Sequence, residues 1–372
     1  MKKPVFLLIL LSALLANKPA FETPSQTRDI YRVENEQKPE MGISLFGTVI
    51  LLDWPYANLV HGKTCKSEIH TLFPLGANML HQETSQDEVR TSTGSIKRFN
   101  DFNSKFVNPR RVDVWLPDGY DSKKKYSVLY MHDGQMLFDS STNWNHQEWG
   151  VDETLGRLMQ EKKIKDCIVV GIWNTALRHQ EYFPQKPFES LNVEENDSVT
   201  KQLQLTLRTT GLFNPLSDNY LKFIVEELKP FIDKTFSTYT NRDNTFIAGS
   251  SMGGLISMYA LCEYPEVFGG AACLSTHWPG SFSTENNPVP EAFVKYLKNN
   301  LPNHKTHKIY FDYGDQTLDA MYPHLQKKVD EVMKSKGFTD KNWVTKFFPG
   351  KDHSEKSWKE RLEIPVLFLL KK

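Results

Sequence analysis

Short apolar segments recur along the last three quarters of the 372-residue chain, and longer segments with helical periodicity separate them. Segments such as CIVVGI (167–172) are apolar throughout, which is typical of strands covered on both faces of a parallel sheet. The expected strands span residues 110–116, 125–131, 165–172, 244–249, 268–275, 307–313 and 343–348. The expected helices span residues 151–161, 218–235, 252–263, 289–300, 320–336 and 355–371.

The alternation of strands and helices predicts an α/β fold with a mostly parallel central sheet and helices on both faces. The first expected strand, RRVDVWL (110–116), instead alternates apolar and polar positions, so we expect it to be an antiparallel edge strand. In sheets of this kind the active site lies at the carboxyl ends of the strands. Catalytic residues are therefore expected where strands end.

The first 95 residues do not follow this pattern. Lys2 and Lys3 precede an apolar stretch from Val5 to about Ala16, which predicts a secretory signal peptide over 1–20, with a retained membrane anchor as the alternative. Residues 21–95 are expected to form an N-terminal extension of unknown role, and residues 96–372 the main domain. The signal peptide predicts export, to the periplasm or out of the cell.

Composition and charge narrow the class of partner. Hydrophobic residues make up 39% and charged residues 24%, which fits a globular protein. Lys plus Arg and Asp plus Glu both total 45, so the zero net charge gives no reason to expect nucleic acid or an anionic membrane as partner. The cysteines are widely spaced, which does not predict a disulfide framework; they are Cys65, Cys167, Cys262 and Cys273.

The strongest chemical motif lies in FIAGSSMGGL (246–255). Gly249-Ser250-Ser251-Met252-Gly253 has the form G-x-S-x-G between an apolar strand and a helix, a turn that presents a nucleophilic serine. Small residues flank the serine because strand and helix approach closely at this turn. Ser251 is therefore the expected nucleophile.

A serine hydroxyl needs a base to take its proton. In this fold the order along the chain is serine, acid, histidine, and five histidines follow the motif: His277, His304, His307, His324 and His353. His353 alone lies between the last expected strand and the terminal helix, so it is the expected base. His277 directly follows a strand and is expected to line the pocket.

The carboxylate that orients the histidine should follow the strand KIYFDY (308–313). Asp319 is favoured, because a loop several residues past the strand has the reach to meet an imidazole. Asp315 remains the alternative acid. Asp312 lies within the strand, so its side chain should point to a face of the sheet.

An oxyanion formed during acyl transfer needs two backbone N–H donors. Met252, which follows the expected nucleophile, supplies the first. The second should come from His132-Asp133-Gly134-Gln135, where another strand ends, and Gln135 is the expected donor. No cluster with the spacing of metal ligands accompanies His132 and Asp133, so these two are expected to shape the loop.

Six blocks of the sequence resemble, in order, an esterase family of α/β-hydrolases. That family includes esterase D-like S-formylglutathione hydrolases, the feruloyl and acetyl xylan esterases of carbohydrate esterase family one, and enterochelin esterases. The matching blocks are VDVWLPDGY (112–120), VLYMHDGQMLFD (128–139), GIWNTALRHQEYFP (171–184), FIAGSSMGGLISMYA (246–260), YFDYGDQTLDAMY (310–322) and GKDHSEKSWKERL (350–362).

The resemblance implies an α/β-hydrolase fold and ester hydrolysis by a serine triad without a cofactor or metal. Ser251, Asp319 and His353 match the family's nucleophile, acid and base. The resemblance further implies that two segments, a loop at the end of a strand and a second short segment, border the pocket. Their side chains would either contact the substrate or pack the loops together. Their residues are Asn174, Arg178, Glu181, Tyr182, His277 and Trp278.

The expected function is that of an exported serine esterase. Its substrate would be an acetyl or feruloyl ester of a polysaccharide, or a siderophore ester. No nucleic acid is expected as a partner, and no membrane is expected as a partner of the mature form. One alternative is a binding protein without turnover on the same scaffold. The other is an acyltransferase or peptidase that uses the same three residues.

Overall fold

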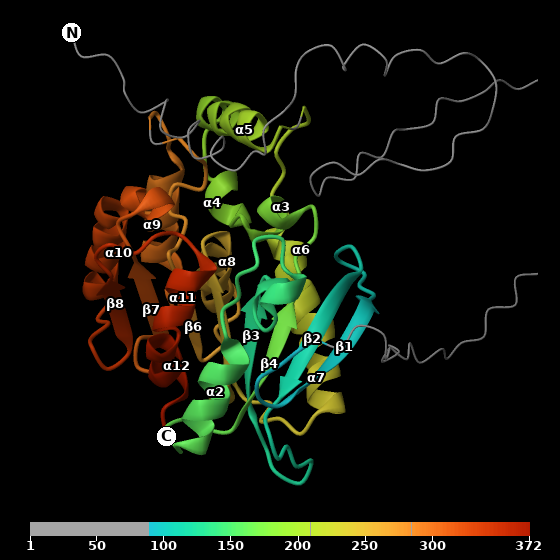
Figure 1. Ribbon diagram of the computed structural model, residues 1–372. Helices are drawn as coiled ribbons and strands as arrows, with labels where there is room; N and C mark the ends of the chain where they lie inside the picture. The colour runs from blue at the N-terminus through green and yellow to red at the C-terminus, as the bar shows by residue number, and fades with distance from the viewer. Residues whose placement is uncertain (1–88, 209, 284) are drawn as a thin grey trace, which may run out of the picture. The chain divides into compact units, whose positions relative to one another are not determined.

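The computed structural model describes residues 89–372 except Thr209 and Thr284. The expected signal peptide and most of the expected extension lie outside the described residues. One eight-stranded sheet runs in the order β1-β2-β4-β3-β5-β6-β7-β8 (Figure 1). Its strands are β1 Ser95–Phe102, β2 Arg110–Leu116, β3 Ser127–His132, β4 Cys167–Ile172, β5 Thr245–Ser250, β6 Gly270–Leu274, β7 Lys308–Tyr313 and β8 Trp343–Phe347.

The expected α/β fold with a mostly parallel sheet is confirmed. Neighbouring strands from β4 through β3 to β8 pair in parallel, whereas β1 with β2 and β2 with β4 pair antiparallel. Strand β2 is thus antiparallel as expected, but the prediction that it forms the edge is wrong. The edge strand is β1, whose sequence SIKRFNDF is mostly polar and buries fully only Phe99 and Phe102.

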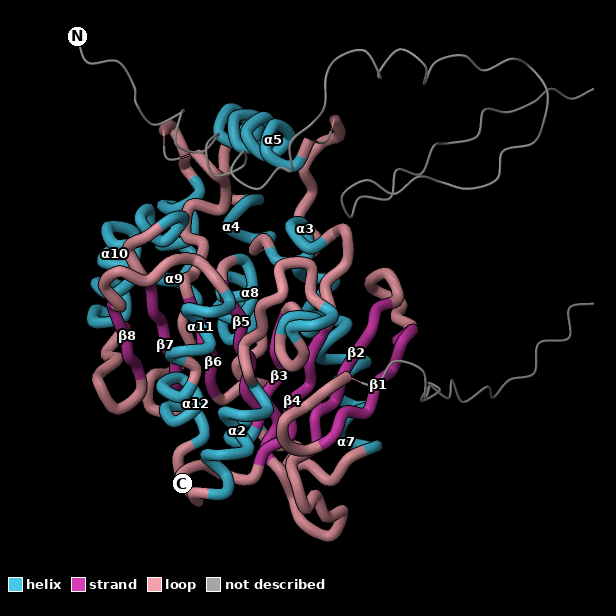
Figure 2. Tube along the Cα trace, in the orientation of Figure 1, coloured by secondary structure: helices cyan, strands magenta, loops and turns pink. Residues whose placement is uncertain are grey.

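Helices cover both faces of the sheet (Figure 2). One apolar core packs under α6 Ser217–Lys222, α7 Lys229–Thr235, α8 Met252–Glu263, α9 Val289–Asn300 and α10 Pro323–Ser335. The other packs under α2 Val151–Gln160, α11 Glu355–Arg361 and α12 Glu363–Leu370. Because both faces are buried, strands such as CIVVGI carry apolar residues without alternation.

The helix expected at 218–235 forms as α6, the π-helical segment η4 Phe223–Leu228 and α7, and two further expected helices also have different bounds in the structure. The segment expected at 320–336 begins as the 3₁₀ turn η6 Thr317–Met321, and α10 starts at Pro323, a residue suited to the first helical turn. The segment expected at 355–371 divides into α11 and α12 at Leu362. Pro365 explains the division, since proline lacks the N–H that a continuing helix requires.

Three helices between β4 and α6 were not expected from the sequence: α3 Arg178–Tyr182, α4 Gln185–Glu189 and α5 Val193–Leu207. Helix α5 carries a readable start signal. Asn192 accepts a hydrogen bond from the N–H of Glu195, and the Glu195 side chain accepts one from the N–H of Asn192. This reciprocal cap is the pattern by which the helix could have been found.

The described cysteines Cys167, Cys262 and Cys273 are buried and free, and burial raises the pKa of each thiol. They behave as small apolar residues. Across residues 89–372, apart from the two omitted positions, no helix has the length and apolar character needed to cross a membrane.

Candidate active site

Ser251 occupies a strained turn between β5 and α8. Its backbone has φ 58° and ψ −122°, a conformation that side-chain-bearing residues rarely adopt. A Cβ on Gly249 would lie 2.8 Å from the carbonyl carbon of Gly253, so the strand and helix meet too closely for any other residue there. The turn is held by hydrogen bonds from Ser251 N–H to Leu274 O (2.9 Å) and from His277 N–H to Ser251 O (3.1 Å).

Asp319 and His353, 34 positions apart in sequence, meet at the carboxyl end of β7. Asp319 Oδ1 lies 2.6 Å from His353 Nδ1, and the carboxyl group is fully buried. Asp319 Oδ2 accepts hydrogen bonds from Ser275 Oγ and Gly314 N–H, both at 2.6 Å. The carboxylate therefore fixes the imidazole with Nδ1 toward itself, which leaves Nε2 as the ring nitrogen free to exchange a proton elsewhere.

The other two carboxylates near β7 have different partners. Asp315 Oδ1 accepts hydrogen bonds from Gly350 N–H (2.7 Å) and Gln316 Nε2 (2.9 Å). Asp312 is buried in an ion pair with Arg361 at 2.9 Å. Of these three carboxylates, Asp319 alone is hydrogen-bonded to His353.

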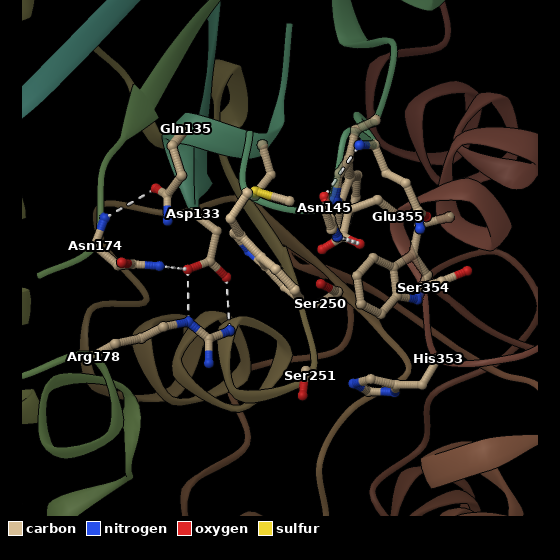
Figure 3. Close-up of a pocket in the computed structure, with 15 residues that line it drawn as sticks. Asp133, Gln135, Asn145, Asn174, Arg178, Ser250, Ser251, His353, Ser354 and Glu355 are labelled. Carbon is tan, nitrogen blue, oxygen red and sulfur yellow. Dashed lines mark hydrogen bonds and ion pairs between the residues drawn. The ribbon is translucent and has the colours of Figure 1, made fainter. Parts of the chain in front are cut away.

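Ser251 and His353 line one cavity of about 620 Å³ (Figure 3). The imidazole of His353 is directed toward the Ser251 side chain in this view. Gln135, the expected oxyanion donor, also lines this cavity, and Met252 begins α8 directly after Ser251. Much of the wall is polar, with side chains of Asp133, Asn145, Gln147, Asn174, Arg178 and Glu355.

The loop that carries Gln135 is anchored through Asp133. Asp133 has left-handed backbone angles (φ 56°), and its carboxylate receives Arg178 Nε and Nη2 at 2.7 and 2.8 Å and Asn174 Nδ2 at 2.6 Å (Figure 3). Burial opposes the charge of Asp133, but the Arg178 charge and these hydrogen bonds lower the pKa of the carboxyl group overall. At Gly134 a Cβ would lie 2.6 Å from the backbone of Gly171 in β4, so this loop packs directly on the sheet.

This anchoring changes the interpretation of two predicted substrate contacts. Asn174 and Arg178 do line the cavity, but the partner of both side chains is Asp133. The Arg178 side chain is 32% exposed, so part of its guanidinium still faces the cavity. Both residues therefore hold the loop, and Arg178 retains access to a bound molecule.

His277 and Trp278, also predicted to contact substrate, are each 1% exposed and do not line the cavity. His277 Nδ1 lies 2.8 Å from the hydroxyl of Tyr322, and Trp278 Nε1 donates to Gln326 Oε1 at 2.8 Å. The prediction is corrected here: both side chains pack inside the protein. The backbone of His277 nevertheless supports the Ser251 turn.

Trp144 is a cavity residue that the sequence did not reveal. It is 84% exposed and lines the cavity from the loop after η3 Ser140–Thr142. That loop is tied to α11, because Asn145 Nδ2 donates to Glu355 Oε2 (2.8 Å) and Lys356 N–H donates to Gln147 Oε1 (3.1 Å). Hydrophobic periodicity could not single out Trp144, since it lies outside any helix or strand.

No group of three or more His, Cys, Asp or Glu side chains suited to a metal ion is present within the described part of the chain. His132 is buried and bonded to the hydroxyl of Tyr220 at 2.9 Å, and burial lowers its pKa to about 3. It is therefore neutral at physiological pH. Its neighbour Asp133 is occupied by Arg178 and Asn174, which agrees with a loop-shaping role for the pair.

Residues 104–365 match the family model described as "Putative esterase". The chain belongs to this family. It is 26% identical over 281 residues to the endo-1,4-beta-xylanase/feruloyl esterase of Xylanibacter ruminicola, covering 73% of this chain and 30% of that one. It is 26% identical over 182 residues to the ferri-bacillibactin esterase BesA of Bacillus subtilis, covering 48% and 56%.

Among solved structures, a ferulic acid esterase aligns with a TM-score of 0.53 at 19% identity, covering 75% of this chain and 98% of that one. This likeness shows the α/β-hydrolase fold. Membership of the esterase family makes the chain a carboxylic ester hydrolase. The chain spans less than two thirds of both curated relatives, so their particular substrates are not transferred with the family.

Proposed function

We propose that this esterase is an exported serine hydrolase with Ser251 as nucleophile, His353 as base and Asp319 as acid. The contact of the buried Asp319 with His353, which lines the same cavity as Ser251, carries the proposal. A fluorophosphonate tests it, because the reagent reacts only with an activated serine. Mass spectrometry should find the adduct on Ser251, and folded protein without any adduct would favour a binding protein.

The geometry suits a two-step acyl transfer. Ser251 Oγ attacks the ester carbonyl carbon while His353 Nε2 takes the hydroxyl proton, and Asp319 stabilises the imidazolium that forms. The oxyanion accepts hydrogen bonds from the N–H groups of Gln135 and Met252, and the N-terminus of α8 favours its negative charge. His353 then protonates the departing alcohol, and water attacks the acyl-enzyme by the reverse sequence. An added alcohol or amine that captured the acyl group would instead indicate a transferase.

A polysaccharide ester is the proposed substrate. An exposed tryptophan at the cavity mouth provides a flat apolar surface for a sugar ring, and the polar wall provides partners for hydroxyl groups. Similarity to a feruloyl esterase supports this choice. A siderophore ester is the second candidate, supported by similarity to BesA. Export rests on the basic and apolar N-terminal sequence.

Trp144→Ala is expected to raise KM for an acetylated or feruloylated xylo-oligosaccharide by about fivefold, the loss of one stacking contact of about 1 kcal/mol. Turnover of nitrophenyl acetate should stay unchanged, because that ester is too small to need the platform. Phe347→Ala, which truncates another exposed aromatic residue on β8, is the matched control. Equal losses on both esters would show that Trp144 supports the site and does not bind sugar.

Arg178→Ala is expected to lower kcat about 10²-fold on nitrophenyl acetate with little change in KM. The substitution leaves the Asp133 carboxylate buried without its cation, so the Gln135 N–H should move away from the oxyanion, and one such donor is worth about 10²–10³ in kcat. Steady-state kinetics separate this from substrate binding, since a pure substrate contact would raise KM and spare kcat. Arg178→Lys keeps the charge without the two parallel hydrogen bonds and should recover only part of kcat.

A further inference from the structure

A second cavity, of about 730 Å³, lies at the end of the sheet opposite Ser251. Most of its wall comes from segments that lead into β5, β7 and β8, around residues 242–246, 304–308 and 337–342, and Lys165 before β4 also lines it. Strands β5 to β8 are parallel neighbours, so their amino ends share one edge of the sheet and their carboxyl ends, with Ser251, share the other. Segments far apart in the sequence therefore build a site that is separate from the ester-binding cavity.

The charge of this cavity is one-sided. Five basic side chains line it together with a single carboxylate, that of Asp243, although the whole chain has no net charge. The basic residues are Lys165, Arg242, Lys305, Lys308 and Lys341. Arg242 Nε pairs with Asp243 at 3.1 Å, whereas none of the four lysines forms an ion pair with a carboxylate of residues 89–372 outside the omitted positions. A concave surface lined mainly by positive charges concentrates anions.

Two of these cations repel each other. Lys308 is half-buried, and its pKa is lowered first by burial and then by the charge of Lys165. Lys165 Nζ reaches neutral oxygens only, Asn244 Oδ1 at 3.1 Å and Asp243 O at 3.4 Å. An anion between the two ammonium groups would remove this repulsion, which makes anion binding favourable at this position.

The segment that carries Lys305 and Lys308 is held in place. The ring nitrogens of His307 lie 2.7 Å from Pro265 O and 3.1 Å from Asn303 O, and the His307 side chain is buried. Asn342 Nδ2 donates to His304 O at 2.6 Å and links this segment to the one before β8. The lysines therefore project from anchored backbone, so little ordering is needed when a ligand binds.

We propose that this basic pocket, lined by Lys165, Arg242, Lys305, Lys308 and Lys341, binds an oligoanion with two or more carboxylate or phosphate groups. Several cations around a cavity of about 730 Å³ match a chain of charges better than a single small anion. Lysine serves as a point charge for either group, without the bidentate geometry of arginine. Since the basic pocket and Ser251 lie at opposite edges of the sheet, the oligoanion and the ester can be bound at the same time.

Isothermal titration of the full chain with trigalacturonate and with tripolyphosphate tests the proposal, with neutral xylotriose as the uncharged control. At low ionic strength we expect saturable binding of at least one oligoanion, weaker binding as salt is added, and none of xylotriose. Binding of trigalacturonate alone would assign carboxylate ligands, and binding of tripolyphosphate alone would assign phosphate ligands. Absence of saturable binding by both would overturn the proposal.

The double variant Lys305→Glu/Lys341→Glu locates the binding, because both side chains are exposed and the fold should not depend on them. Affinity is expected to fall at least tenfold. Lys123→Glu/Lys222→Glu changes the net charge equally at exposed positions outside the basic pocket and should retain affinity. Equal losses in the two double variants would refute a site in this pocket, and unchanged turnover of nitrophenyl acetate in both shows that they fold.

Discussion

Ser251→Ala is expected to lower kcat on nitrophenyl acetate by about 10⁴–10⁶-fold, the scale on which serine hydrolases lose activity without their nucleophile. The reason is direct, since no other hydroxyl replaces the oxygen that forms the acyl-enzyme. Steady-state kinetics on purified protein measure the loss, and the fluorophosphonate adduct should disappear with it. Alanine at φ 58° is strained about as much as serine, so thermal unfolding should change little.

Ser250→Ala is the matched control for Ser251→Ala. Ser250 is the adjacent residue in the same motif, is 4% exposed and lines the same cavity. It is, however, the last residue of strand β5 and does not occupy the turn. Its hydroxyl should be dispensable for turnover. If Ser251→Ala kept activity within tenfold of the parent, the nucleophile would be a different residue. A large loss in Ser250→Ala alone would identify Ser250 as that residue.

Asp319→Asn is expected to reduce kcat by about 10³–10⁴-fold on the same ester. A neutral amide does not stabilise the imidazolium, and its NH₂ group can hold His353 in the wrong tautomer. The effect should fall on kcat, because Asp319 has no surface in the cavity and cannot bind substrate. Thermal unfolding measured in parallel separates this loss from the cost of disturbing the Ser275 and Gly314 hydrogen bonds.

Asp315→Asn provides the comparison, since it makes the same chemical change four residues earlier. Asp315 contacts Gly350 and Gln316, and it is partly exposed, so turnover should stay within about twofold. The reverse order of the two losses would make Asp315 the acid. Similar losses in both variants would mean that the whole loop, and not one carboxylate, orients His353.

Local sequence was sufficient for most of the fold. Runs without polar residues predicted the parallel strands, because both faces of the sheet are covered. Local sequence did not predict β1, which is largely polar because an edge strand buries few side chains. It also did not predict the short helices α3 and α4. These elements depend on neighbouring segments more than on their own periodicity.

The candidate nucleophile and base were also identifiable from sequence. The small residues around Ser251 reflect a close approach of β5 and α8, which is a local requirement, and chain order led to His353. The loop containing Asp315 and Asp319 held two carboxylates of the same type at similar distances from the strand end. Spacing along the chain therefore favoured one without excluding the other.

The sequence by itself thus determined the parallel strands and the Ser251 turn, because these depend on residues close together in the chain. Tertiary packing determined that Asp319 meets His353, that Arg178 pairs with Asp133, that His277 and Trp278 are buried, and that Trp144 is exposed. It also assembled the basic pocket from segments at the starts of four different strands. Each of these contacts joins residues that are distant in sequence, so their distances depend on how the helices pack on the sheet.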